Sequence, residues 1–174
     1  MLGKPAAADE GPLVHKGARV GRQIGPMLAQ AHEGPLPGAG WLYEIKWDGY
    51  RCIARCEGGT VSLQSRSGLA LNFPAVAEEL EELEVDCVLD GEMIMVDAQG
   101  RSSFHGLTNA RGNGVLYVVF DVLEAQGMDV RGFPLEARQE LLHDLVADGR
   151  LVQISPAFED GEALLAHARE NELE

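Results

Sequence analysis

The sequence has little basic charge for its size. Its 14 Lys and Arg residues face 28 Asp and Glu residues, which gives a net charge of −14. A protein that grips nucleic-acid phosphates usually presents a basic face, so the isolated chain is expected to bind nucleic acid weakly. The deficit is uneven, because residues 1–55 have a balance of +2 and the remaining residues one of −16.

Cysteines and long apolar runs are also scarce. The three cysteines, Cys52, Cys56 and Cys87, form no Cys-x-x-Cys pair, and their odd number argues against a disulfide framework. The spacing of Cys52 and Cys56 puts both on one side of a strand, where we expect them to pack. No apolar run approaches the ~20 residues of a membrane span, and the N-terminus lacks a signal peptide's apolar segment. We therefore expect a globular protein of the reducing cytoplasm, with no membrane partner.

What is present indicates one folded domain. At 174 residues and 45% hydrophobic content the chain can bury a sizeable core. Residues 1–24, rich in Ala, Gly and Pro, predict a flexible leader, and residues 25–174 the domain. Alternating or apolar runs predict strands at residues 41–46, 51–55, 60–66, 87–96, 115–123 and 151–155. Helices are expected between them, so the fold class is α+β, with mainly antiparallel sheets flanked by helices.

Lys46 is the first candidate for chemistry. It closes the predicted strand 41–46, which places it at the lip of a pocket. Asp48-Gly49 is a turn signal, so we expect a hairpin that returns as strand 51–55 and brings Arg51 close to Lys46. A nucleophilic lysine must lose its proton, which requires a cationic neighbour, a metal or a dry site, and Arg51 is a candidate neighbour.

Other residues indicate a binding site. Asp90 and Glu92 flank Gly91 in an apolar strand and point to one face, where a divalent cation, a ribose hydroxyl or an arginine would balance their charge. Arg66, at a strand end, suits a bidentate phosphate contact, although an exposed surface residue is equally consistent. Phe120, in a run of valines, is by itself an ordinary core residue.

Together these pieces resemble a known family. In order they are Glu44-x-Lys46-x-Asp48-Gly49-x-Arg51, Ser65-Arg66, Asp90-Gly91-Glu92 and Phe120-Asp121. Over about residues 22–174 the chain is similar to the adenylation (nucleotidyltransferase) domain of ATP-dependent DNA ligases. A Pro-Met-Leu-Ala stretch at residues 26–29 resembles the bacterial end-joining kind. The resemblance implies an ATP-grasp-like nucleotidyltransferase domain.

The resemblance also implies a reaction and roles. Lys46 would attack the α-phosphate of ATP to form lysyl-AMP, and AMP would then pass to a DNA 5′-phosphate so that a nick is sealed. The DNA would be nicked or broken duplex, met at the nucleoid. The implied roles are adenine recognition for Glu44, phosphate or nucleotide binding for Arg51 and Arg66, a cover over the adenine ring for Phe120, and ribose or Mg²⁺ (or Mn²⁺) binding for Glu92.

The sequence departs from the family pattern at its end. Family members continue with a Glu-Gly motif whose glutamate binds metal, a pair of lysines and an OB-fold domain. Glu174 stands where that glutamate is expected, so we expect an incomplete domain that is impaired alone, and a separate chain is a candidate source of the OB-fold domain. Two alternatives stay open. One is an RNA ligase or capping-type nucleotidyltransferase, and the other is a non-catalytic binding module that acts through its acidic faces.

Overall fold

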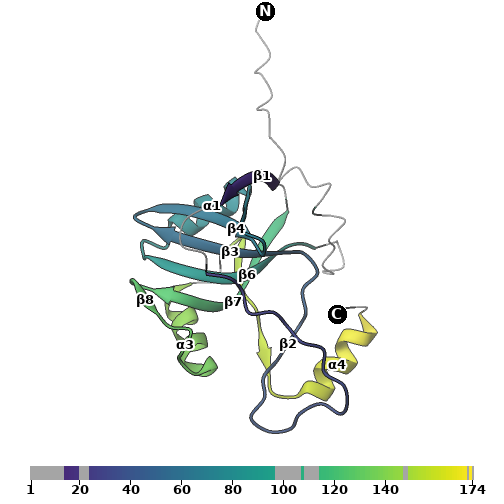
Figure 1. Ribbon diagram of the computed structural model, residues 1–174. Helices are drawn as coiled ribbons and strands as arrows, with labels where there is room; N and C mark the ends of the chain where they lie inside the picture. Colours follow the sequence, from purple (N-terminus) through teal and green to yellow (C-terminus); the bar gives the residue numbers. More distant parts are fainter. Residues whose placement is uncertain are drawn as a thin grey trace, which may run out of the picture.

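The computed structural model describes residues 14–19, 24–96, 107, 114–146, 149–171 and 173 (Figure 1). Within these residues, eight strands form one sheet in the order β1-β5-β4-β3-β6-β7-β8, with β9 beside β7. Only the β7–β9 pairing is parallel among those described; the others are antiparallel. The predicted α+β class is confirmed. The strands are β1 Val14–Arg19, β3 Tyr50–Glu57, β4 Thr60–Ser65, β5 Leu69–Leu71, β6 Cys87–Met95, β7 Val115–Ala125, β8 Met128–Asp129 and β9 Val152–Ile154.

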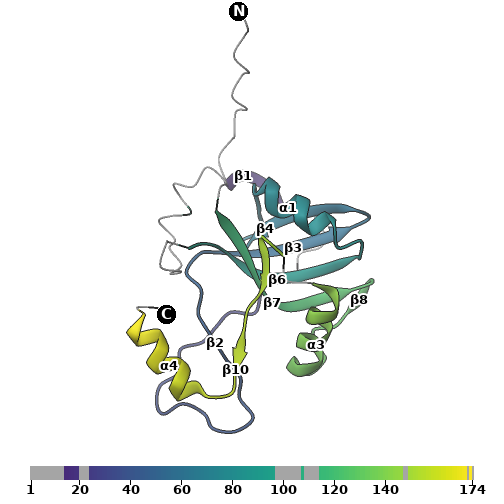
Figure 2. The ribbon, with the colours of Figure 1, turned by 180° about the vertical axis from the view of Figure 1, so that it is seen from behind.

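Helices cover one face of this sheet. Figure 2 labels the two helices, α1 (Pro74–Glu81) and α3 (Leu135–Leu145). Both contribute side chains to the main core, which also contains Cys52, Cys56 and Cys87. The expected packing of Cys52 and Cys56 on one side of a strand is confirmed. The opposite face buries only a small apolar cluster and is left for polar side chains. In the described part of the chain, no helix has the length and apolar character that a membrane span requires.

The core fits together around Tyr117 and Gly91. Tyr117 is fully buried, and its hydroxyl donates to the carbonyl oxygens of Cys52 (3.0 Å) and Leu89 (3.2 Å). A Cβ atom at Gly91 would lie 2.5 Å from the Val118 carbonyl oxygen and 2.6 Å from the Tyr117 ring. Only a glycine therefore lets β6 and β7 approach this closely around the tyrosine.

The predicted hairpin between Lys46 and Arg51 is wrong. The strand expected over residues 41–46 is reduced to β2 (Tyr43–Glu44), which pairs with β10 (Ala157–Phe158) in a separate two-stranded sheet near α4 (Gly161–Glu170) (Figure 1). Gly49 lacks the positive φ that a tight hairpin turn requires. A Cβ atom there would collide with the Met93 carbonyl, so this glycine serves a close approach where the chain enters the main sheet.

One strand lies inside the predicted leader. Val14–Arg19 forms β1 and pairs antiparallel with β5. The division of the chain into a leader and a domain stays a prediction.

Candidate functional site

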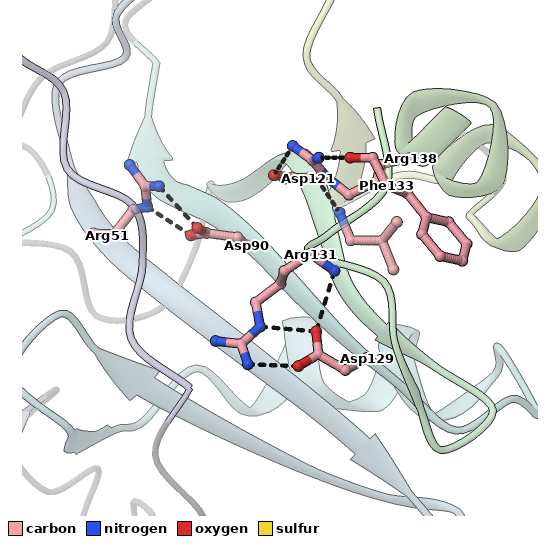
Figure 3. Close-up of polar contacts among 8 residues, drawn as sticks. Arg51, Asp90, Asp121, Asp129, Arg131, Phe133 and Arg138 are labelled. Carbon is pink, nitrogen blue, oxygen red and sulfur yellow. Dashed lines mark hydrogen bonds and ion pairs between the residues drawn. The ribbon is translucent and has the colours of Figure 1, made fainter. Parts of the chain in front are cut away.

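An ion pair between Arg51 and Asp90 stands at the centre of the open sheet face. Arg51 on β3 donates from Nε to Oδ1 of Asp90 (2.6 Å) and from Nη2 to Oδ2 (2.8 Å), as Figure 3 shows. Asp90 on β6 is only 2% exposed. Burial alone would lower the pKa of Arg51, but the bonded Asp90 carboxylate outweighs this effect and raises it. The partner of the acidic pair is thus an arginine, one of the three possibilities that the sequence left open.

Phe120 lies beside this ion pair because of a β-bulge. Asp90 pairs with Asp121 and Gly91 with Val119, which leaves Phe120 as an extra residue on β7. Bulges of this kind often redirect a side chain next to a functional site. The guanidinium carbon of Arg51 lies 4.4 Å from the centroid of the Phe120 ring, within the range of a cation–π contact. Phe120 is half-buried and is therefore not the ordinary core residue that its neighbours indicated.

Glu92 extends the acidic side of the same face. It pairs with Arg51 in the β3–β6 register, so the two side chains share a face with Asp90. Burial raises the pKa of Glu92 to about 7, while the charges of Arg51 and Lys46 oppose the rise. Lys46 is exposed. Its positive charge nevertheless lowers the pKa of Glu92, so the lysine lies within electrostatic reach of Glu92 without the predicted hairpin.

Two contacts with the C-terminal part of the chain hold the segment around Lys46. On one side, Glu44 of β2 pairs with Ala157 of β10. On the other, the Trp47 indole Nε1 donates to the hydroxyl of Ser155 at 3.1 Å, and Ser155 is buried. Sequence reasoning missed this anchor, because nothing in the sequence links residues so far apart.

Glu44 completes the group near Arg51. Protein atoms surround its carboxylate closely enough that lost hydration, the largest cause, raises its pKa to about 7. The negative charge of Asp121 adds to this rise, and Arg51 opposes it. Glu44 is nevertheless an exposed residue, so water screens part of this effect. The direction indicates a carboxylate that can take up a proton near neutral pH.

Asp121 has an arginine of its own. Arg138, on α3, donates from Nε to Oδ1 of Asp121 (2.8 Å) and from Nη2 to Oδ2 (3.1 Å). Its Nη1 also donates to the Phe133 carbonyl (2.6 Å), as Figure 3 shows. Nothing in the sequence indicates this role, because Arg138 lies in a helix and outside the motifs.

Two predicted site residues remain, Arg66 and Glu174. Arg66 is exposed in the turn after β4. The neighbouring Ser65 pairs with Cys52, which places Arg66 at the same end of the sheet as Arg51. Glu174 lies outside the described residues.

Glu92 is the residue of the site that is best suited to bind a magnesium ion. Among the described residues, no group of three or more His, Cys, Asp or Glu side chains is arranged to hold a metal. Mg²⁺ often binds through one or two carboxylates together with substrate phosphates. Glu92 has the oxygen ligand for this mode. Burial raises its pKa, so a bound cation would favour the ionised carboxylate.

The fold defines a nucleotidyltransferase-type ligase domain. A solved mycobacterial DNA ligase D complexed with ATP and MES superposes with a TM-score of 0.76 at 30% identity, over 87% of this chain and 52% of that chain. Residues 26–167 match the family model described as ATP dependent DNA ligase domain. The chain therefore belongs to the ATP-dependent DNA ligase family.

Sequence relatives agree with this assignment. The multifunctional non-homologous end joining protein LigD of Pseudomonas aeruginosa is 40% identical over 134 residues, which are 73% of this chain and 16% of that protein. DNA ligase C1 of Mycolicibacterium smegmatis is 31% identical over 79% of this chain and 45% of its own length. The chain thus spans less than half of these relatives.

Proposed function

We propose that the chain is the adenylation domain of an ATP-dependent DNA ligase. It would form lysyl-AMP and transfer AMP to a DNA 5′-phosphate, so that a nick is sealed in repair or recombination. The observation that carries this proposal is the convergence of Arg51, Asp90, Glu92 and Phe120 on one sheet face within electrostatic reach of Lys46. Family membership supplies the class of reaction.

Lys46 is the proposed nucleophile. It is the only lysine after residue 16 in the whole sequence, so no other nearby amine competes for the assignment. As a neutral amine, its Nζ lone pair forms the bond to the α-phosphorus of ATP while the bond to the pyrophosphate oxygen breaks. The displaced amine proton passes to solvent. The anchors at β10 and Ser155 would hold the backbone on both sides of Lys46 during this step.

The other residues would bind and orient the nucleotide. Phe120 would cover the adenine with the ring face that Arg51 leaves open, and ionised Glu44 would accept a hydrogen bond from the adenine amino group. Arg51 and Arg66 would contact ribose or phosphate. Glu92 would bind Mg²⁺ (or Mn²⁺), which when bound neutralises charge on the phosphates. Glu174 as a second metal ligand stays a prediction.

The proposed partner is nicked or broken double-stranded DNA, met in the cytoplasm at the nucleoid. The net charge of −14 implies weak binding by this chain alone. Supply of an OB-fold domain by a separate chain stays a prediction. Membership in the DNA ligase family favours DNA over the RNA ligase and capping alternatives.

A labelling experiment tests the proposal. The protein is incubated with Mg²⁺ or Mn²⁺ and ATP radiolabelled at the α-phosphate, and covalent label is measured after denaturation. Lys46→Arg keeps the positive charge but removes the nucleophile, and Lys16→Arg is the matched control. Because the domain alone is expected to be impaired, we expect label to accumulate slowly on the wild type and the control and not at all on Lys46→Arg, with slow transfer to the 5′-phosphate of a nicked duplex.

Other outcomes would favour other functions. Label that survives in Lys46→Arg would contradict the assignment of the nucleophile. Preference for labelled GTP over ATP would indicate the capping class. Complete absence of label on the folded wild type, after long incubation with either metal, would favour a non-catalytic binding module.

A further inference from the structure

Two aspartates face each other across the central strands of the sheet. Asp90 on β6 pairs directly with Asp121 on β7, immediately beside the bulge at Phe120. Like charges at directly opposed positions of an antiparallel pair are destabilising. Each carboxylate is bound by a different arginine, Asp90 by Arg51 and Asp121 by Arg138 (Figure 3). The arrangement therefore needs two cations, although only Arg51 belongs to the predicted site.

Arg138 holds Asp121 firmly. Its guanidinium makes two parallel bonds to the Asp121 carboxylate and a third to the Phe133 carbonyl, and its side chain is only 12% exposed. A planar fork of this kind fixes a carboxylate in position as well as neutralising it. Asp121 also accepts the Val122 backbone N–H, so the residue that directly follows Phe120 is held by α3 and by its own strand.

We propose that Arg138 is a positioning residue of the nucleotide site, which keeps Arg51 on Asp90 and over the Phe120 ring by neutralising Asp121. This inference rests on the proposed function. It assigns a site role to a helix on the covered side of the sheet, and it extends the site beyond the residues that would contact the nucleotide.

The competition for Arg51 explains why this role matters. If Arg138 is removed, the Asp121 carboxylate loses its own cation while it still stands opposite Asp90. Arg51 then becomes the cation that both aspartates attract. Any shift of its guanidinium toward Asp121 weakens its bonds to Asp90 and moves it off the Phe120 ring.

The first test separates nucleotide binding from chemistry. Arg138→Ala is compared with wild type in the Lys46 labelling reaction as a function of ATP concentration. We expect the ATP concentration at half-maximal rate to rise about tenfold, the loss typical of a charged hydrogen bond, with a much smaller change in the maximal rate. Arg138→Lys should show an intermediate effect, because an ammonium cannot reproduce the bidentate fork.

Arg131 provides a matched control. It makes a bidentate pair with Asp129, with distances of 2.9 and 2.6 Å (Figure 3). Unlike the pair of Arg138 with Asp121, both side chains are more than 40% exposed. Arg131→Ala should leave the ATP dependence unchanged. Thermal midpoints of all variants show whether a change reflects folding alone.

A rescue variant distinguishes positioning from simple docking of α3. In Asp121→Asn/Arg138→Ala the unneutralised charge is gone, so the ATP dependence should return close to that of the wild type. If Arg138 only fastened the helix, the double variant would remain as defective as Arg138→Ala. That result, or an unchanged ATP dependence in a folded Arg138→Ala, would overturn the proposal.

A readout without catalysis keeps the two proposals distinguishable. The Arg51 side-chain Nε–H signal in an NMR spectrum, assigned by its loss in Arg51→Lys, reports the hydrogen bond to Asp90. We expect it to shift in Arg138→Ala and to return in the double variant. If the wild type takes no label but this pattern appears, the proposed function fails while the positioning of Arg51 stands. If the Arg51 Nε–H signal has the same chemical shift in Arg138→Ala as in the wild type, the positioning proposal alone is overturned.

Discussion

The two parts of the candidate site are held in different ways. Arg51, Asp90, Glu92 and Phe120 lie on β3, β6 and β7, central strands that are paired along most of their length. Lys46 lies outside these strands, after the two-residue strand β2. The contacts that hold its segment include the pairing of β2 with β10 and a hydrogen bond from Trp47.

This contrast suits the proposed reaction. A nucleotide needs a preorganised surface. A central sheet supplies one, because the packing of its opposite face fixes the strands that carry the site residues. The nucleophile must approach phosphorus and retreat with AMP attached, and segments with few buried contacts open at low cost. We therefore expect mutations in the sheet to cost mainly stability and mutations around Lys46 to cost mainly rate.

The largest effect is expected at the sheet. Gly91→Ala places a methyl group against the Val118 carbonyl and the Tyr117 ring, at 2.5 and 2.6 Å, and neither can move without disturbing the pairing of β6 and β7. Overpacking of this kind should lower the free energy of unfolding by about 3 kcal/mol, measured by denaturant titration.

Gly38→Ala is the matched control in the other region, because a Cβ atom there meets nothing within 4 Å. It should change the free energy of unfolding by less than about 0.5 kcal/mol. Equal losses in the two variants would contradict the view that the two regions differ in packing.

The sequence predicted the central sheet because its signals there are local. β6 and β7 are apolar runs of the right length, and Asp90, Gly91 and Glu92 had to share an alternating strand. The bulge at Phe120 was not predictable, because a one-residue shift in pairing leaves no mark on composition. The expected fold class and the shared face of Asp90 and Glu92 were therefore correct, whereas the valine run around Phe120, taken alone, indicated an ordinary core residue.

The region around Lys46 was mispredicted because its partners are distant in sequence. Asp48-Gly49 has the composition of a hairpin turn, and only the packing of Gly49 against Met93 shows that it serves another purpose. The pairing of β2 with β10 and the contact of Trp47 with Ser155 each join segments more than 100 residues apart. The pairing of Arg138 with Asp121 likewise depends on how α3 docks.

The next effect concerns the anchor of Lys46. Trp47→Phe keeps the aromatic bulk but leaves the buried Ser155 hydroxyl without its indole donor. We expect the free energy of unfolding to fall by about 1 kcal/mol, the net value of a typical hydrogen bond, and the rate of Lys46 labelling to fall more than this loss of stability explains. Trp41→Phe, at a side chain that is 59% exposed, should change neither quantity. If labelling were unaffected in folded Trp47→Phe, the anchor would have no role in placing the lysine.

The smallest effect is a pH dependence that originates at Glu44. Its pKa is raised from 4.5 to about 7 in the folded state, first by burial and then by the charge of Asp121. A raised carboxyl pKa means that the folded state binds the proton more tightly, so this contribution to stability is complete below about pH 4.5 and is lost as the pH rises through about 7.

In Glu44→Gln the side chain at this position carries no charge at any pH. Its thermal midpoint should therefore match that of the wild type in acid and exceed it slightly above about pH 8, whereas Glu78→Gln, on the exposed side of α1, should show no such divergence. A Glu44→Gln curve parallel to the wild type across this range would show that the carboxylate is well hydrated, and the segment that carries Lys46 would then be more open than the sheet face beside it.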